Sequence, residues 1–566
     1  MNLKYHLFKI HKIDSFLIVA LLISFILCIQ GITWGRVESW NMDDVAFSFF
    51  HGLKRIFQSP GWFLKPPFHG YFNFFLSYLP LKLIEDLFNL APNSLSSGEV
   101  ILIWSRFLTI ILFLSSSVLV FYITKRFFDY FSARIITLLF ASSAGFISYT
   151  HFLTADIPVT FWMLLVFYFI QSIYLKGKTF DYILAGFFTG IATATKYNGL
   201  AIGITIVFAH LLSFDDVDVK KIIFSKKLFL GLFMVFAGFI FGNPFALLDY
   251  HKFLSDFLYN YFTTPIYAGT TTGNSYGKFF LYFQELIGLP SLIIFSISVL
   301  FSLYLTLIVK EKDTYIKPIL LLLSVCLLYY WKFGSFPRLE VRFVLPIVPF
   351  WLIMSGPFWN KVKPNQLLVL SILIILIGYN TICSLYVGQR FLEDPRMSAQ
   401  IWVQKNVPEL SSIESSPYTP NWNALPKVKL KNERFPGISG RQKFFKEAFK
   451  NKPYILKLIE VSENKVENIK WYSTENLLKR NPKYIAINSL YYERFLQNKN
   501  KARLYPEINL FFKSLLEEKF YKIVFEQESN KFPSWIYPQN IDFLNNKMII
   551  FARKELRELQ KNNSPK

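Results

Sequence analysis

Apolar runs recur along this chain up to residue 388, and most of them are long enough to cross a lipid bilayer as a helix. Short polar stretches separate them. The first run, residues 13–34, reads IDSFLIVALLISFILCIQGITW. Hydrophobic residues make up 53% of the 566 residues, which leaves too little polar surface for a soluble protein. The pattern therefore predicts an all-α polytopic membrane protein over this part of the chain.

The sequence predicts about eleven transmembrane helices, over residues 14–34, 101–123, 134–151, 158–175, 180–195, 199–213, 227–246, 287–309, 317–333, 343–359 and 366–388. The stretch 68–90 is aromatic but carries Lys82, Glu85 and Asp86, which favours an interfacial helix over a span. We expect the first run to remain as a span, because it is longer than a signal peptide core and no small-residue cleavage site follows it.

Basic residues predict the orientation of these helices. With the N-terminus in the cytoplasm, every inner segment carries at least two of them, and the outer loops carry fewer. This places the protein in the cell inner (cytoplasmic) membrane as a multi-pass protein, with residues 389–566 outside. The net charge of +23 then serves orientation and contact with anionic lipid. We expect no nucleic-acid partner, because the chain has no groove-reading motif.

The composition changes after residue 388, where the chain becomes rich in Lys, Asn and Glu. Strand-like runs cover 484–488, 521–526 and 547–553, and a helix-like stretch covers 508–521. We therefore expect two domains. Residues 1–388 form a transmembrane domain whose first outer loop, 35–100, holds interfacial helices. Residues 389–566 form an extracytoplasmic α/β domain with a frayed tail.

An acidic pair, Asp43-Asp44, follows the first span at the predicted outer surface. A like-charged neighbour raises the pKa of one carboxyl, which suits a general base that takes a proton from a hydroxyl. The alternative is a helix N-cap, because Asp44 precedes VAFSFFHGLKRIF, a stretch with amphipathic spacing. Both interpretations can hold, with one carboxylate capping the helix and the other facing a site.

Cations from distant parts of the chain lie on the same predicted side. Lys65 precedes two prolines, which make its backbone stiff, and a fixed ammonium outside a membrane suits a phosphate headgroup. Arg106 lies near the outer end of its span and needs a partner, either a phosphate or a carboxylate of the first outer loop. Arg342 follows Arg338 and Glu340, which suggests either phosphate contacts or an internal ion pair.

Further polar residues lie in the outer turns between spans. Asp156 precedes Ile157-Pro158 and could support a polar site or cap the next helix. Lys196 and Asn198 lie in a tight turn that Gly199 permits, and could support the same site or simply anchor the turn at the interface. A transporter would more often carry its ionisable residues at the bilayer midplane, so this one-sided set favours a site that is entered from outside.

These motifs together resemble a known family. In chain order they are MDDVAFSFFHG, WFLKPPFHGYF, ADIP, TATKYNG, NPFALLDYHKF and RFVLPIVPF. Their order and spacing are similar to polyprenyl-phosphate-sugar-dependent glycosyltransferases of the GT-C fold, which include the protein O-mannosyltransferase family (family 39) and the bacterial lipid A aminoarabinose transferases. The resemblance covers about residues 14–360. DPRMSAQIWVQKNVP and KYIAINSLYYERF are more loosely similar to the outer tail of bacterial relatives.

The resemblance implies a role for several residues. Asp43 matches the acid that is the proposed catalytic base of the family, and Lys65 matches its carrier-phosphate lysine. Asp44 stands where the family has a longer Glu, which leaves the role of the second acid open. Arg106 matches a phosphate-contacting arginine, and Asp156 matches the acid of the second outer loop. Arg342 takes the place of the basic residue in R-[YF]-x-L-P.

The resemblance implies an enzyme that moves a hexosyl or pentosyl group from a polyprenyl-phosphate carrier to a hydroxyl of a lipid, protein or polysaccharide, with inversion. Cations can hold the carrier phosphate, so no cofactor is required. A divalent metal ion bridging Asp43 and Asp156 is the alternative. Two other functions stay open at this point, a sugar-polymer ligase that uses a pyrophosphate-linked lipid donor and a lipid or polysaccharide transporter.

Overall fold

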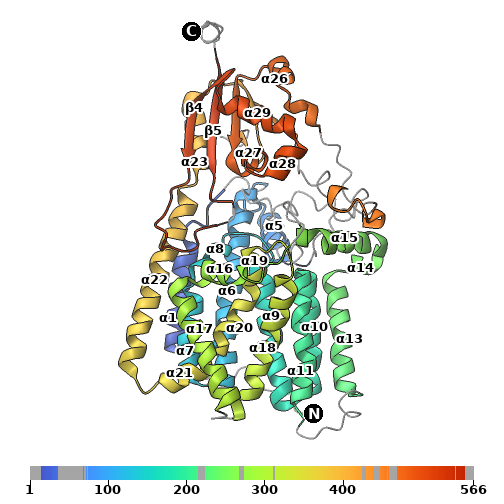
Figure 1. Ribbon diagram of the computed structural model, residues 1–566, viewed down its shortest axis with the longest axis vertical. Coiled ribbons are helices and arrows are strands. Elements are labelled where there is room, and N and C mark those ends of the chain that lie inside the picture. Colours follow the sequence, from blue (N-terminus) through green and yellow to red (C-terminus); the bar gives the residue numbers. More distant parts are fainter. Residues whose placement is uncertain are drawn as a thin grey trace.

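A bundle of long helices carries a small mixed sheet at one of its ends (Figure 1). The coordinates are a computed structural model. The structure describes residues 14–35, 68, 72, 74–92, 94–214, 224–266, 273–309, 313–422, 429–436, 446–455, 457, 468–541 and 543–554.

The helices of the bundle follow the apolar runs of the sequence. They are α1 (Ser15–Ile29), α6 (Gly98–Phe127), α7 (Tyr130–Ala141), α8 (Ala144–Tyr149), α9 (Asp156–Lys176), α10 (Thr179–Thr195), η2 (Tyr197–Gly203), α11 (Ile204–Leu212), α13 (Lys226–Gly242), α17 (Leu289–Leu303), η4 (Tyr304–Ile308), α18 (Asp313–Gly334), α19 (Val341–Val344), η5 (Leu345–Ile347), α20 (Val348–Met354), α21 (Gly356–Val362) and α22 (Gln366–Leu392).

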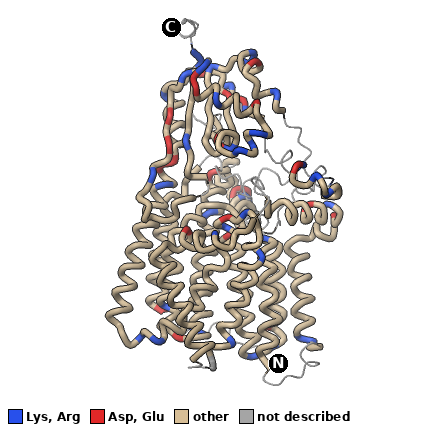
Figure 2. The backbone as a smooth tube through the Cα atoms, in the orientation of Figure 1, with Lys and Arg blue, Asp and Glu red and all other residues tan. Residues whose placement is uncertain are grey.

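Six helical stretches among the described residues are long and apolar enough to cross a membrane: Gly98–Phe127, Asp156–Lys176, Leu289–Ile308, Tyr315–Gly334, Val341–Val362 and Gln366–Asn406. The other five predicted spans also contain helices, but shorter ones. Charged residues gather at the two ends of the bundle and on the sheet unit, while the middle of the bundle is almost free of them (Figure 2). This distribution is the one a bilayer requires, and it confirms a mostly helical, multi-pass membrane protein.

Shorter elements cover the end of the bundle that faces the sheet. They are η1 (Phe74–Tyr78), α5 (Leu79–Leu87), α14 (Phe245–Leu248), α15 (Tyr250–Thr263), η3 (Thr264–Ile266) and α16 (Lys278–Ile287). The predicted interfacial stretch 68–90 is thus helical from residue 74 to residue 87. Leu83 and Leu87 are exposed on α5, at 57% and 76%, next to the polar residues of the same helix, which is the pattern of a helix lying at a membrane surface.

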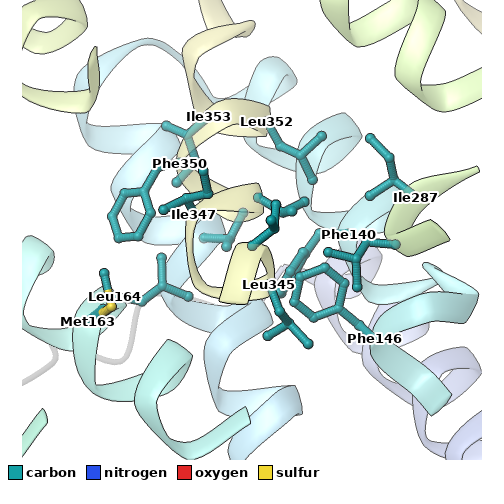
Figure 3. Close-up of a cluster of buried hydrophobic side chains, with 14 of the residues drawn as sticks. Phe140, Phe146, Met163, Leu164, Ile287, Leu345, Ile347, Phe350, Leu352 and Ile353 are labelled. Atoms are coloured by element: carbon teal, nitrogen blue, oxygen red, sulfur yellow. The ribbon is translucent and has the colours of Figure 1, made fainter. Parts of the chain in front are cut away.

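The core of the bundle forms around a broken helix. Prolines at 346, 349 and 357 lie in the first turns of η5, α20 and α21, and so divide the stretch 341–362 into α19, η5, α20 and α21. Ile347 and Phe350 are almost fully buried there, against side chains of neighbouring helices that include Phe140 and Leu164 (Figure 3). Because this stretch is buried on nearly all sides, it is a central helix of the bundle rather than a lipid-facing one.

The sheet has five strands, in the order β2-β1-β3-β5-β4. The strands are β1 (Ser412–Ser415), β2 (Lys431–Arg434), β3 (Tyr484–Asn488), β4 (Tyr521–Glu528) and β5 (Lys547–Arg553). β1 pairs in parallel with β2 and β3, whereas β5 runs antiparallel to β3 and β4. The helical elements around the sheet are α23 (Pro395–Asn406), η7 (Ile469–Tyr472), α26 (Thr474–Arg480), α27 (Ser489–Leu496), α28 (Lys499–Leu504) and α29 (Pro506–Leu516). The strands predicted at 484–488 and 547–553 are confirmed.

The connection between β4 and β5 enters the core of the helical bundle. Ile536 and Tyr537 are 2% and 3% exposed and belong to the same buried cluster as the membrane helices. The Tyr537 hydroxyl donates to Asn380 Oδ1 of α22 at 2.7 Å and accepts from the Ala144 amide at 3.2 Å. The sheet unit is therefore fixed to the bundle by core packing and not only by the chain that joins them.

Helices α10 and α13 pack backbone against backbone. Gly190 of α10 and Gly238 of α13 make this possible, because a Cβ at either position would collide with main-chain atoms of the other helix. Small residues at such a contact let two membrane helices approach closely and gain dispersion energy. The close approach matters for the site below, because α10 and α13 both end at the face of the bundle that carries the sheet.

The first prediction concerns this contact. Gly190→Ala should force α10 and α13 apart and destabilise the protein by about 1–3 kcal/mol, the usual cost of overpacking. Gly378→Ala on α22 is the matched control, because a Cβ there meets no atom within 4 Å. We expect the control to leave the thermal unfolding midpoint in detergent unchanged or slightly raised. Equal midpoints for the two variants would show that the helices are not in close contact.

Glu85 of α5 ties this interfacial helix to the start of α6. Its carboxylate is 1% exposed and accepts hydrogen bonds from the amides of Leu95 and Ser96, at 2.6 and 2.5 Å, and from the Ser96 hydroxyl at 2.8 Å. Burial alone would raise the pKa of Glu85, but the hydrogen bonds from Ser96 and Leu95 outweigh it and lower the pKa to about 2.

The second prediction follows from this lowered pKa. Since the folded pKa lies below the ordinary value of 4.5, the ionised carboxylate stabilises the fold. This stabilisation is complete at pH values above the ordinary pKa of 4.5, and it is lost as the pH falls towards the pKa of the folded state, about 2. Glu85→Gln should therefore lower the unfolding midpoint in detergent at neutral pH, and the difference from wild type should shrink at acid pH. The exposed Asp86 supplies the control, Asp86→Asn, and a difference for Glu85→Gln that does not depend on pH would contradict the assignment.

Candidate functional site

Several of the residues predicted for the site fall in the first outer loop. Asp43, Asp44 and Lys65 lie outside the described residues, so their proposed roles stay predictions. The other candidates, Arg106, Asp156, Lys196, Asn198 and Arg342, lie among the described residues, in or directly beside α6, α9, α10, η2 and α19. The charged residues at the end of the bundle that faces the sheet include both signs (Figure 2).

Asp156 and Lys196 form an ion pair between two neighbouring helices. Asp156 is the first residue of α9, with Ala155 as the N-cap, so its side chain is free of a capping role. Its Oδ1 lies 2.5 Å from Nζ of Lys196, which ends α10. Asp156 is 2% exposed, and the Lys196 side chain is 23% exposed and lies 5.4 Å from the centre of the Phe343 ring. The structure thus brings together two residues predicted for the site from separate outer turns.

The side chains of Asn198 and Asn243 have buried polar atoms without a hydrogen-bond partner among the described residues. The Asn198 carbonyl accepts from the Tyr329 hydroxyl at 3.1 Å, which fixes the turn after α10. Neither the side-chain nitrogen nor the side-chain oxygen of Asn198 has a hydrogen-bond partner among the described residues. The same holds for Asn243, the C-cap of α13, which is 1% exposed. Buried amides without partners are costly, and they favour positions that receive a polar ligand.

Glu340 lies between two arginines just before the broken helix. It accepts from Arg342 Nε at 2.6 Å and also pairs with Arg338. Burial raises the pKa of Glu340, but the two guanidiniums outweigh it and lower the pKa below its usual value. Arg342 is also close enough to interact electrostatically with Asp156. The internal ion pair that the sequence left open for Arg342 is therefore present.

Arg106 is buried at the base of the first outer loop. Its Nη1 donates to the carbonyl of Ile32 at 2.7 Å and to that of Trp34, and its guanidinium lies 5.4 Å from the centre of the Trp34 ring. These contacts hold the turn that follows α1, whose last residue is Ile29. Contact between Arg106 and a carrier phosphate stays a prediction, because these bonds serve the backbone of that turn.

The charges at this face suit an anion rather than a metal ion. Lys196, Arg338 and Arg342 outnumber Asp156 and Glu340 in this cluster. Because the Lys196 ammonium already occupies the carboxylate of Asp156, a divalent ion there would have to displace a cation. Among the described residues no group of three or more His, Cys, Asp or Glu side chains could hold a metal. A metal ion bridging Asp43 and Asp156 stays a prediction, because Asp43 lies outside the described residues.

Sequence reasoning missed a second buried cluster at the same face. Asp394 and Arg396 form an ion pair with both side chains fully buried, and Trp34 donates to Asp394. The available signal was the DPR sequence at 394–396, which resembles a family tail motif and which also places Asp394 as the N-cap of a helix with proline at its first position. The partner, Trp34, lies 360 positions away along the chain.

Comparison with known proteins supports the predicted resemblance. The family described as dolichyl-phosphate-mannose-protein mannosyltransferase matches residues 101–241, which include Arg106, Asp156, Lys196 and Asn198. The resemblance to this family is thus confirmed for that quarter of the chain. A search of curated proteins finds no match.

Solved structures also match, at low sequence identity. ArnT from Cupriavidus metallidurans bound to undecaprenyl phosphate is 12% identical, with 96% of this chain and 98% of that chain covered and a TM-score of 0.49. The archaeal oligosaccharyltransferase AglB from Archaeoglobus fulgidus, in complex with an inhibitory peptide and a dolichol-phosphate, is 14% identical, with coverages of 93% and 75% and a TM-score of 0.47. Likeness at this level carries no argument about activity.

The third prediction concerns the ion pair between Asp156 and Lys196, and tests the contribution of each charge. Asp156→Asn leaves Lys196 without its carboxylate, and we expect a loss of about 1–3 kcal/mol, less than for a fully buried pair because Lys196 is partly exposed. The double variant Asp156→Asn with Lys196→Met removes both charges and should recover most of this loss. Thermal unfolding in detergent measures both effects.

The control for this prediction is the exposed ion pair between Lys479 and Glu475, whose side chains are 68% and 76% exposed. Glu475→Gln should leave the unfolding midpoint almost unchanged. If Asp156→Asn behaves like this control, the pair is not buried in the way the structure describes.

Proposed function

We propose that this protein is a membrane glycosyltransferase that transfers a sugar from a polyprenyl-phosphate carrier to an acceptor hydroxyl on the outer face of the membrane, with inversion. The family match over residues 101–241 is the observation that carries this proposal. The geometry of two matched residues adds to it, because Asp156 at the start of α9 and Lys196 at the end of α10 form an ion pair.

In the proposed reaction, Asp43 accepts the proton of the acceptor hydroxyl while that oxygen attacks the anomeric carbon. The bond between this carbon and the phosphate oxygen breaks, and the electron pair leaves with the polyprenyl phosphate. The products are the glycosylated acceptor and the lipid phosphate. No step in this scheme uses a metal ion.

Cations stabilise the charge that grows on the leaving phosphate. Lys65 and Arg342 are the proposed contacts, with Arg106 at the base of the loop that carries Asp43. Asp156, Lys196 and Asn198 support the site, since the pair holds Lys196 in place and the Asn198 amide is left to bind a polar group. Asp44 is proposed either as a second acid or as the cap of the following helix.

The proposed architecture is of the GT-C type, with eleven spans in the cell inner (cytoplasmic) membrane. Its N-terminus lies in the cytoplasm. Residues 1–388 then form the catalytic transmembrane domain, with the first outer loop at 35–100. Residues 389–566 form the extracytoplasmic α/β domain. The excess of basic residues in the inner segments supports this orientation. A lipid, a protein or a polysaccharide can serve as the acceptor, and a hexose or a pentose as the sugar.

The fourth prediction tests the base. Asp43→Asn should lower sugar transfer from a polyprenyl-phosphate donor by about 10²–10⁴-fold, the usual contribution of a general base. The assay measures polyprenyl phosphate released by purified protein in nanodiscs, with a membrane extract as the source of acceptor. Mass spectrometry of the glycans and lipids missing from a deletion strain identifies the sugar and the acceptor.

Two companion measurements make this test specific. Asp86→Asn changes an exposed carboxylate of the interfacial helix and should leave transfer near the wild-type rate. A donor linked through pyrophosphate separates a sugar-polymer ligase, which would use it in preference. Near-normal transfer by folded Asp43→Asn protein would refute the assignment of the base.

A further inference from the structure

Trp34 is the last apolar residue before the first outer loop, and it is held from several sides. It is 1% exposed. The guanidiniums of Arg106 and Arg396 lie 5.4 and 5.3 Å from the centre of its ring. Phe152 and Phe391 make edge contacts with the ring, at centroid distances of 5.8 and 5.3 Å. A tryptophan enclosed in this way has one rotamer, so its own backbone is held at the end of the first predicted span.

The indole N–H of Trp34 binds a fully buried ion pair. It donates to Asp394 Oδ2 at 2.9 Å. The same carboxylate accepts from Arg396 Nη2 at 2.6 Å and from Arg396 Nε at 2.9 Å, and both of these side chains are 0% exposed. A buried ion pair of this kind is stable only if its remaining donors and acceptors have hydrogen-bond partners. The stability of the Asp394–Arg396 pair therefore depends on the hydrogen bond from Trp34.

The pair belongs to the sheet unit as well as to the bundle. Asp394 caps α23, the first helix after the membrane helix α22, and Arg396 Nη2 donates to the Phe543 carbonyl at 2.7 Å. Phe543 lies in the connection that leads into β5. Asn546, at the start of that strand, receives a hydrogen bond from the Asn488 amide at the end of β3, at 3.0 Å. Because Asn546 Nδ2 also donates to Asp394 Oδ1 at 3.5 Å, buried hydrogen bonds link Trp34 through Asp394 and Asn546 to the end of the central strand β3.

We infer that Trp34, Asp394 and Arg396 are positioning residues that set where the first outer loop leaves the bundle, and with it the placement of Asp43. This inference rests on the proposed function for the role of Asp43, which lies nine residues after Trp34. The outer unit therefore takes part in the reaction by holding the loop that carries the base. It does so without contributing a residue that touches the substrate.

The chemistry of this cluster defines the expected effects. Trp34→Phe keeps an aromatic ring but removes the N–H that donates to Asp394. Asp394→Asn keeps the size of the side chain but removes the negative charge that both Trp34 and Arg396 bind. A displaced general base loses much of its effect, because a misplacement of about 1 Å can cost roughly 10²-fold in rate. We therefore expect each variant to lower turnover per folded protein at saturating donor by about 10-fold or more.

A second cluster of a tryptophan, an arginine and a carboxylate, inside the sheet unit, provides the control. Arg480 pairs with the buried Glu414 at 2.7 Å and lies 3.7 Å from the centre of the Trp471 ring, inside the sheet unit. Trp471→Phe and Glu414→Gln should lower the unfolding midpoint in the way their counterparts do, but should leave turnover per folded protein unchanged. A purely structural role for Trp34 and Asp394 would give the two sets of variants the same turnover.

The position of the loop can be measured without any enzyme assay. The native cysteines Cys28, Cys326 and Cys383 are buried, so a Ser39→Cys variant offers a single reactive thiol in the loop. We expect Trp34→Phe and Asp394→Asn to change the rate of labelling by a membrane-impermeant maleimide several-fold, whereas Trp471→Phe and Glu414→Gln should not change it.

The outcomes separate this inference from the proposed function. An unchanged labelling rate in all variants overturns the inference, whatever the enzyme does. A changed labelling rate supports the positioning of the loop even if Asp43→Asn retains full transfer, in which case only the proposed base is wrong. Changed labelling together with normal turnover in Trp34→Phe would show that the loop is held there but that the reaction does not depend on it, which also overturns the inference.

Discussion

The ion pair between Asp394 and Arg396 is the interaction on which the joint between membrane bundle and sheet unit depends. Two full charges without exposure to water cost several kcal/mol each unless every polar atom is satisfied. Here the missing partners come from two separate parts of the chain, the Trp34 indole of the bundle and the Phe543 carbonyl of the sheet unit. The pair can therefore exist only when both units are in place, which makes the joint specific as well as stable.

A second joint acts beside this one and makes the sheet unit rigid. The β4–β5 connection inserts Tyr537 into the core of the bundle, and Arg390 of α22 donates to the carbonyls of Pro538 and Gln539, at 2.9 and 3.1 Å. Two independent contacts remove the hinge that a single linker would allow. A movement of the whole sheet unit is therefore unfavourable. In the proposed reaction, the acceptor would have to enter through movement of shorter segments near the site.

Periodicity and length in the sequence were enough to predict most of the helices and the strands at 484–488 and 547–553, because burial of apolar side chains repeats along those segments. β1 and β2 were not predicted. They read Ser-Ile-Glu-Ser and Lys-Asn-Glu-Arg and have no apolar alternation, so their pairing with β3 decides their structure. In the site, the turn residues Asp156 and Lys196 were predicted but not their contact. The role of Trp34 depends on a partner 360 positions away, which no local pattern reveals.

The membrane explains why the polar groups of the site take this arrangement. A charge inside the bilayer must find a partner within the protein, so Asp156, Lys196 and Arg106 can lie at the ends of their helices only with fixed contacts. Those contacts also orient the groups. Lys196 is held by Asp156 at 2.5 Å and Arg106 by the carbonyls of Ile32 and Trp34. Cations that are already fixed stabilise a developing negative charge better than mobile ones, because no reorientation is needed as the charge grows. In the proposed reaction, the demands of folding in lipid and of phosphate departure would therefore favour the same placement of these side chains.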